Sequence, residues 1–311
     1  IMPSLVGSEM CIRDRALPLQ HLGLVGYGEV GRIFSAGLRS HFAACAAWDL
    51  KFADPAAGIA AQATQAGVQA MPSMAALCAQ SDFLISAVTA SNTLAVAQAA
   101  APHLRAGTVF LDLNSASPGT KQEAAALVEA AGGRYVEAGV MTSVPPYGIK
   151  VPMLLGGALA TELADQLNAL GMDAKAVSAD IGVASAIKMC RSVMIKGLEA
   201  LVIESYATAR AYGVEDHVLP TLAETFPSID WEKQGAYFFS RVVQHGQRRA
   251  EEMRESARTV AEAGFAPTMA SAIADKQQWV ADQARAGVFA HVGRTSPWQV
   301  YADALLAAPK A

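Results

Sequence analysis

The chain has 311 residues, of which 17% are charged, and its formal net charge is −4. This length accommodates two domains of ordinary size. The slight acidity argues against nucleic acid as a partner, because nucleic-acid-binding proteins present basic faces and the one short basic stretch here surrounds Arg248. The uncharged residues 83–104 contain several polar side chains and Pro102, so they predict a strand, a loop and a helix rather than a membrane span.

Residues 1–16 resemble neither a domain nor a targeting segment. Their apolar part is too short for a signal peptide, and acids and bases follow it. The string IMPSLVGSEMCIRDR is similar to a translated sequencing adaptor, so we treat residues 1–16 as a non-native leader. We expect the folded chain to begin near Leu17.

The cysteines and histidines predict no metal site. Cys11, Cys45, Cys78 and Cys190 lack metal-ligand and CxxC spacing, and the six histidines show no HxxxH pairing. We expect the cysteines to be buried, reduced side chains in a cytoplasmic protein.

The first folded segment carries a glycine motif between a strand and a helix. An apolar run, Gln20–Val25, leads into Gly26-Tyr27-Gly28-Glu29-Val30-Gly31, and a helical pattern follows. The first glycine permits a tight turn, the second lets backbone approach a pyrophosphate, and the third lets the helix pack closely on the strand. The free N–H groups of such a helix bind phosphate. The motif therefore predicts a dinucleotide site; a glycine-rich turn without a ligand is the alternative.

Asp49 ends the second apolar run, 18 residues after Gly31 (49 − 31). A carboxylate about 20 residues past the motif binds the ribose hydroxyls of NAD and repels the 2′-phosphate of NADP. Lys51 is close enough to reverse that preference. We predict NAD as the cofactor, with NADP as the alternative.

Short apolar runs alternate with helical patterns up to about residue 180. This alternation predicts a Rossmann-type α/β domain over residues 17–181, with a doubly wound, mainly parallel sheet. Ligands on such sheets bind at the carboxyl ends of the strands. The predicted strands are 20–25, 43–48, 68–70, 83–88, 108–113, 135–140, 153–155 and 174–177; the predicted helices are 29–39, 56–65, 74–78, 93–101, 120–131 and 160–170. Ser117-Pro118 and Thr161 are predicted helix starts, and Gly132-Gly133 a helix stop.

The remainder, residues 182–311, predicts an all-α domain for substrate binding and dimerisation. Residues 184–212 contain no proline and one glycine, which predicts a helix of about 29 residues. Apolar residues surround much of this helix, so we expect at least a homodimer to bury it. Further helices are predicted at 217–225, 231–244, 248–263, 269–286 and 297–306, with Gly246 among the residues that separate them.

Four segments resemble the β-hydroxyacid dehydrogenase family, which includes 6-phosphogluconate and 3-hydroxyisobutyrate dehydrogenases. LGLVGYGEVG resembles the phosphate loop, and SAVTASN the loop after the fourth strand. LDLNSASP resembles the family segment beside the nicotinamide, and IGVASAIKMCRS the motif with the catalytic lysine. The C-terminal half resembles the subgroup with a phosphogluconate-dehydrogenase-like C-terminal domain of undefined function.

The resemblance implies an NAD(P)-dependent oxidoreductase acting on a small hydroxy acid of the 3-hydroxyacid type. It implies cofactor contacts at Val88, Thr89 and Asn114 in addition to the glycine motif, Asp49 and Lys51. It implies substrate contacts at Ser115, Ser117, Met141, Thr142 and Ser192. Two departures put the substrate in doubt: Ser192 replaces the family's asparagine, and residues 137–143, Glu-Ala-Gly-Val-Met-Thr-Ser, lack the usual Ser-Gly-Gly anchor.

Lys188 is the predicted general acid or base. Oxidation of an alcohol requires removal of the hydroxyl proton, and a lysine performs this when its pKa falls from about 10.4 towards neutrality. Lys188, Ser192, Lys196 and Glu199 share one face of the long helix at about 100° per residue. Lys196 and Arg191 could supply the charge that lowers the pKa, and Ser192 and Lys196 could bind substrate. The alternative is a solvated polar face.

Two other groups have both a functional and a structural interpretation. His245, Arg248 and Arg249 form a basic cluster that we place at a helix start, where the arginines would bind a substrate carboxylate or phosphate; a solvated helix with acidic partners is the alternative. Ser115 and Ser117 could bind substrate or the nicotinamide amide, or cap the helix at Pro118.

Two further functions stay open. An imine or ketone reductase shares this architecture, although Lys188 argues against it. A nucleotide-binding redox sensor or scaffold without catalysis is the other. Turnover of any hydroxy acid would exclude the sensor.

Overall fold

The computed structural model describes Leu17 and residues 19–308, so residues 1–16, which the sequence analysis predicts to be a non-native leader, and Cys11 among them lie outside the described residues. The chain divides into two compact units, the first ending at Lys188 and the second beginning at Met189. The domain boundary predicted from the sequence, between residues 181 and 182, lies just before the long helix, whereas this division falls inside that helix.

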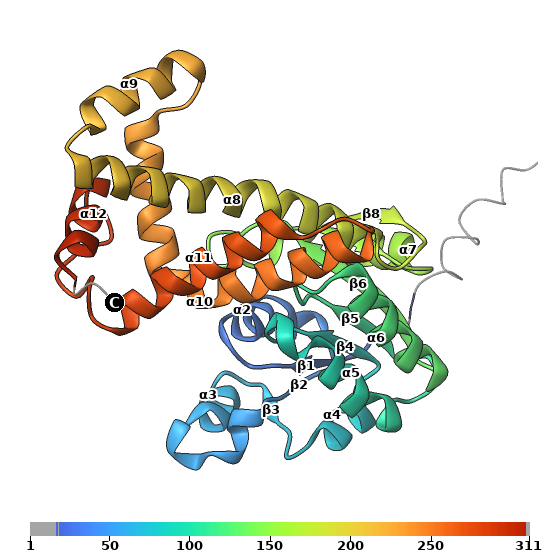
Figure 1. Ribbon diagram of the computed structural model, residues 1–311. Helices are drawn as coiled ribbons and strands as arrows, with labels where there is room; N and C mark the ends of the chain where they lie inside the picture. The colour runs from blue at the N-terminus through green and yellow to red at the C-terminus, as the bar shows by residue number, and fades with distance from the viewer. Residues whose placement is uncertain (1–16, 18, 309–311) are drawn as a thin grey trace, which may run out of the picture. The chain divides into compact units, whose positions relative to one another are not determined.

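The first unit contains one eight-stranded sheet with the order β3-β2-β1-β4-β5-β6-β7-β8 (Figure 1). Neighbouring strands are parallel except for the β6–β7 pair. The predicted Rossmann-type, mainly parallel sheet is therefore confirmed. The strands are β1 His21–Val25, β2 Ala44–Trp48, β3 Gln69–Ala70, β4 Phe83–Ser86, β5 Val109–Asp112, β6 Arg134–Val140, β7 Pro152–Gly156 and β8 Asp173–Ser178.

Helices cover both faces of this sheet. They are α2 Glu29–Leu38, α3 Ile59–Gln65, α4 Met74–Gln80, α5 Thr93–Ala100, α6 Pro118–Ala130 and α7 Ala160–Ala169. Apolar residues from α2, α3 and α7 join one core cluster, and those from α4, α5 and α6 join the other. Thr161, a predicted helix start, lies inside the first turn of α7, which begins at Ala160 without a side-chain cap.

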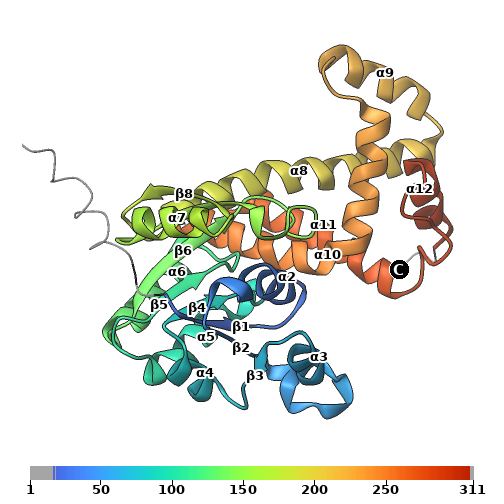
Figure 2. The same ribbon diagram turned by 180° about the vertical axis from the view of Figure 1, so that it is seen from behind.

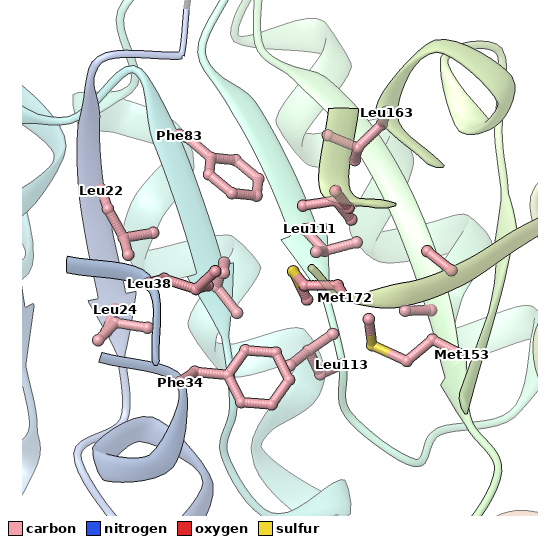
Figure 3. Close-up of a cluster of buried hydrophobic side chains, with 14 of the residues drawn as sticks. Leu22, Leu24, Phe34, Leu38, Phe83, Leu111, Leu113, Met153, Leu163 and Met172 are labelled. Carbon is pink, nitrogen blue, oxygen red and sulfur yellow. The ribbon is translucent and has the colours of Figure 1, made fainter. Parts of the chain in front are cut away.

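Alternate residues of each strand enter opposite cores, because strand side chains point to the two faces in turn. Ile85 belongs to one cluster and its neighbour Leu84 to the other. Figure 3 shows the first cluster, in which Phe34 and Leu38 of α2 lie against strand residues such as Leu24. Both faces are buried, which is why these strands are nearly continuous apolar runs.

The second unit is helical, as predicted. Its helices are the continuation of α8 Val183–Tyr212, then α9 Glu215–Thr225, α10 Trp231–Glu262, α11 Thr268–Arg285 and α12 Trp298–Ala307. Helices α10 and α11 lie side by side (Figures 1 and 2). Within the described residues, no helix combines the length and apolar character needed to cross a membrane.

The two helices predicted at 231–244 and 248–263 are a single helix, α10, so that prediction was wrong. Gly246 lies inside α10 and is buried. A Cβ at this position would lie 2.8 Å from the Gln277 carbonyl oxygen of α11. Gly246 therefore allows α10 and α11 to pack closely and does not mark a turn. The sequence could not show this, because the contacting residue, Gln277, is distant in the chain.

Candidate functional site

The glycine motif forms a turn and an open helix terminus. Gly26 has φ +93°, and a Cβ there would lie 2.6 Å from the Ala87 carbonyl oxygen. A Cβ on Gly31 would lie 2.1 Å from the Gly26 carbonyl oxygen, whereas one on Gly28 would meet nothing within 4 Å. Gly28 precedes α2 without a side-chain cap. The first N–H groups of α2 and the space beside Gly28 therefore fit an anion such as a pyrophosphate.

Asp49 lies directly beside this turn. One carboxylate oxygen accepts a hydrogen bond from the Tyr27 N–H at 2.7 Å, and the other accepts from the Lys51 N–H at 2.9 Å. The Tyr27 ring is buried and packs edge-on against Phe52, with 6.0 Å between ring centroids. A carboxylate has about four acceptor positions, so two remain for ribose hydroxyls. The Lys51 side chain is exposed.

Asn114 joins the loops after β4 and β5. Its side-chain oxygen accepts from the Val88 N–H at 2.7 Å, and its amide nitrogen donates to Ser86 Oγ at 2.9 Å. Thr89, beside Val88, is exposed. The cofactor residues predicted in these two loops therefore lie at the carboxyl edge of neighbouring parallel strands, where ligands of such sheets bind.

Lys121, Asp112 and Tyr135 form a buried polar group behind this edge, which the sequence analysis did not identify. Lys121 Nζ lies 3.0 Å from Asp112 Oδ1, with both side chains almost inaccessible, and Tyr135 donates to Asp112 Oδ2 at 2.6 Å. Burial, and then the Asp112 charge, raise the pKa of Tyr135 well above its usual range, so its hydroxyl stays a donor. The Asp112 carboxylate also accepts from the Asn114 N–H. Helical spacing gave a signal, because Lys121 shares the buried face of α6 with Ala124 and Ala125.

Lys188 and Ser115 meet in the first unit. Lys188 Nζ donates to Ser115 Oγ at 2.5 Å, although the two residues are 73 apart in the chain. Lys188 is partly exposed, as is Ser115. An amine and a hydroxyl at this distance can both contact one substrate hydroxyl, which is the arrangement that general acid–base catalysis requires.

Glu137 is the second functional candidate that sequence reasoning missed. Its side chain is fully buried and accepts hydrogen bonds from Gly182, Ala184 and Ser185 at the start of α8. Glu137 belongs to residues 137–143, the segment predicted to bind substrate, but its carboxylate binds backbone and side-chain groups of this chain. Met141 and Thr142, also in that segment, follow β6; the Met141 N–H donates to Pro152, and Thr142 is exposed.

The polar face of α8 continues into the second unit and is buried there. Ser192, Lys196 and Glu199 are at most 9% exposed, so this face is not solvated. Lys196 Nζ lies 2.8 Å from Glu252 Oε2 and 3.3 Å from Ser192 Oγ. The charge of Lys196 is therefore balanced within the chain, which weakens its predicted roles as a substrate ligand and as a cation that lowers the pKa of Lys188.

The predicted basic cluster does not lie at a helix start, because α10 is continuous through it. Arg249 is buried and forms an ion pair with Glu199 of α8. Arg248 is exposed, with its Nε 3.9 Å from Glu252 Oε1, and His245 is exposed as well. Acidic partners, which the alternative interpretation predicts, are therefore present. The partner of Arg248 lies on the same helix, whereas the partner of Arg249 lies on α8.

Ser117 caps α6, as the structural interpretation predicted. Its Oγ accepts from the Thr120 N–H at 3.3 Å, and the residue is fully buried. Ser117 and Ser115 therefore differ in environment although they are two residues apart.

The prediction that every cysteine is buried was wrong for Cys190. Cys45 and Cys78 are buried, and burial raises the pKa of each thiol to about 11. Cys190 is exposed on α8. In the part of the chain that the structure describes, no three His, Cys, Asp or Glu side chains are grouped to hold a metal ion.

Comparison with known proteins places this arrangement in a family. Residues 21–146 match the NAD binding domain of 6-phosphogluconate dehydrogenase, and residues 209–280 match a domain of unknown function, DUF1932. A conserved hypothetical protein from Sinorhizobium meliloti 1021 is 39% identical, with 92% of this chain and 96% of that chain covered and a TM-score of 0.74. The conserved protein MTH1747, described as structurally similar to 3-hydroxyacid dehydrogenases, is 30% identical, with coverage of 85% and 99% and a TM-score of 0.65.

This chain belongs to the β-hydroxyacid dehydrogenase family. The DUF1932 match also confirms the predicted subgroup of its C-terminal half. Two more distant enzymes share the fold. A 3-hydroxyisobutyrate dehydrogenase from Mycobacterium tuberculosis is 17% identical, with coverage of 93% and 100% and a TM-score of 0.65. A reductive aminase from Aspergillus terreus is 19% identical, with coverage of 93% and 99% and a TM-score of 0.55.

Proposed function

We propose that this β-hydroxyacid dehydrogenase family member transfers a hydride between NAD and the alcohol carbon of a small 3-hydroxy acid, with Lys188 as the general acid or base. The observation that carries the proposal is the 2.5 Å contact between Lys188 Nζ and Ser115 Oγ. Each residue belongs to a separate family-like motif, and the fold brings the two side chains together.

Oxidation of the alcohol requires one acceptor for a hydride and one for a proton. NAD, when bound, would supply the acceptor for the hydride that leaves the carbinol carbon. Lys188, in its uncharged form, accepts the hydroxyl proton as the carbonyl forms. In the reverse reaction Lys188 returns this proton to the oxygen. Ser115 orients the same oxygen through its hydroxyl. The first turn of α2 would hold the pyrophosphate of this cofactor, and Asp49 would hold its adenosine ribose.

The substrate contacts proposed beyond Lys188 and Ser115 differ in support. Met141 and Thr142 follow β6, whose carboxyl end lies at the same edge of the sheet as that of β5. Ser192 is one helical turn beyond Lys188 on α8. Lys196 and Arg249 are engaged by carboxylates of this chain, which favours a structural role for both.

The test is Lys188→Met in the full chain. Turnover should fall by about 10²–10⁴, the usual contribution of a positioned acid–base group. NAD(H) affinity should change little, because the cofactor residues lie on other elements. The pH dependence of kcat/KM in the wild type should disappear in the variant. Lys196→Met is the matched control on the same helix and should retain most of the turnover; the reverse pattern would assign the role to Lys196.

An imine or ketone reductase is the second candidate, and the two activities are separable with one assay. Absorbance of the reduced nicotinamide is followed with a panel of 3-hydroxy acids, and then with ketones with and without an amine. Oxidation of a hydroxy acid supports the dehydrogenase. Amine-dependent consumption of the reduced cofactor without hydroxy-acid oxidation would replace it, and binding without any turnover would favour a redox sensor.

We further propose a homodimer formed through α8. Ile187, Met194 and Leu201 recur every seven residues on this helix and are 41%, 74% and 57% exposed. A seven-residue apolar repeat is the pattern by which helices pair along a seam. Light scattering at micromolar concentration should give twice the mass of one chain. Met194→Glu should lower the measured mass towards that of a single chain. A monomeric wild type would contradict the proposal.

A further inference from the structure

The first turn of α8 is held by one buried carboxylate on β6. Glu137 Oε1 accepts from the Gly182 N–H at 2.7 Å and the Ala184 N–H at 2.9 Å. Its Oε2 accepts from the Ser185 N–H at 3.3 Å and from Ser185 Oγ at 2.7 Å. The first N–H groups of a helix have no partner within the helix, so one side chain of another element satisfies three of them.

Two glycines make this contact possible. A Cβ on Gly156 of β7 would lie 2.6 Å from Glu137 Oε1 and displace the carboxylate. A Cβ on Gly139 of β6 would lie 2.9 Å from the Ala184 carbonyl oxygen and 3.5 Å from Lys188 Cβ. The strand surface is therefore shaped both for the carboxylate and for the helix turn that it holds.

Lys188 follows directly from this turn. It lies three residues after Ser185, so the two side chains share a face of α8. Both side chains are held by the first unit: Ser185 by Glu137 of β6, and Lys188 Nζ by Ser115 Oγ in the loop after β5. A rotation or shift of the first turn would move the amine away from the hydroxyl, and a misplacement of about 1 Å can reduce a rate about 100-fold.

We propose that Glu137 is a positioning residue, whose carboxylate fixes the first turn of α8 on β6 and thereby holds the Lys188 amine against the Ser115 hydroxyl. The proposal rests on the proposed function for the catalytic task of the amine. The placement of the amine itself is measurable without any substrate.

The experiment measures the reactivity of Lys188 in the full chain. Acetic anhydride labels free amines, and peptide mass spectrometry gives the labelling of Lys188 relative to the exposed Lys233 at a series of pH values. The wild type is compared with Glu137→Gln, which keeps the size of the side chain but places an amide N–H₂ where a carboxylate oxygen accepted. The Glu137 carboxylate is bound at Ser185, three residues before Lys188, and loss of its negative charge disfavours the ammonium form of lysine, so the labelling midpoint should move to lower pH. Release from Ser115 should raise the labelling rate as well.

A matched control separates positioning from loss of a carboxylate that accepts backbone hydrogen bonds elsewhere in the first unit. Asp82 accepts from the Gln20 and His21 N–H groups, each at 2.9 Å, at the amino end of β1. Asp82→Asn should leave Lys188 labelling as in the wild type. Ser185→Ala removes one of the four hydrogen bonds to Glu137 and should raise labelling by less than Glu137→Gln, which provides a second variant if the first fails to fold.

A double substitution tests whether Glu137 acts through the Lys188–Ser115 contact. If it does, Glu137→Gln should add little to the labelling rate of Ser115→Ala at pH values above both labelling midpoints, because the contact is already lost. Additive effects would overturn the proposal. So would a Glu137→Gln protein that unfolds cooperatively, binds NAD(H) as the wild type does and labels Lys188 at the wild-type rate and midpoint. If labelling changes as expected while no substrate is turned over, the positioning role stands and the proposed function falls.

Discussion

Both units of this protein contain buried carboxylates, but the carboxylates serve different purposes in the two units. At the carboxyl edge of the sheet, Asp112 and Glu137 accept hydrogen bonds from backbone N–H groups of the loops and the helix that carry the candidate site. In the second unit, Glu199 and Glu252 pair with cations of neighbouring helices. The first kind of contact shapes a site, whereas the second joins α8 to α10. A buried cation near a family motif is therefore weak evidence for a ligand site until its partner is known.

The largest effect expected in the second unit follows removal of Arg249. Arg249→Met leaves the buried Glu199 carboxylate without its main cation, and should lower the free energy of unfolding by about 3–5 kcal/mol. Urea unfolding followed by circular dichroism measures this difference. Arg248→Met is the matched control, because its exposed ion pair should contribute at most about 1 kcal/mol.

The double variant Glu199→Leu with Arg249→Met sharpens this comparison. It removes both charges together and should recover much of the lost stability. If Arg249→Met is as stable as the wild type but weakens substrate binding, the arginine belongs to a ligand site and the distinction between the two units fails.

Gly31 and Gly28 should separate stability from cofactor binding within the first unit. Gly31→Ala places a methyl group 2.1 Å from the Gly26 carbonyl oxygen, and the resulting shift should lower the free energy of unfolding by about 1–3 kcal/mol. Gly28→Ala meets no protein atom within 4 Å at φ −75°, so stability should be unchanged or slightly higher.

Calorimetric titration with NAD(H) provides the second measurement on these variants. The methyl group of Gly28→Ala occupies space that the pyrophosphate requires, so affinity should fall roughly tenfold, equivalent to about 1.4 kcal/mol. Unchanged affinity in Gly28→Ala would mean that the dinucleotide does not approach this turn.

The last prediction concerns cofactor preference. Asp49→Ala removes the carboxylate that is proposed to bind the ribose, and the ratio of the NAD(H) to NADP(H) dissociation constants should move towards one. A hydrogen bond to a charged group contributes about 1.5–3 kcal/mol, which sets the upper limit of the change. The ratio is the quantity to compare, because loss of the bonds to Tyr27 and Lys51 should weaken both cofactors. Tighter NADP(H) binding by the wild type would contradict the preference and implicate Lys51.

The sequence by itself determined the elements and the local motifs. The glycine motif, the alternation of strands and helices, the long α8 and the Ser117 cap depend on residues close together in the chain, where backbone geometry and side-chain period decide the structure. Lys188 and Ser115 were each identified in this way.

Only the tertiary structure decided which polar groups meet. The Lys188–Ser115 contact, the four hydrogen bonds to Glu137 and the Glu199–Arg249 pair join residues 73, 45–48 and 50 positions apart. Gly246 shows the same limit, since the sequence could not reveal that its partner is the backbone of α11. A buried charge must find a partner wherever the fold provides one, and sequence spacing carries no information about contacts made through folding.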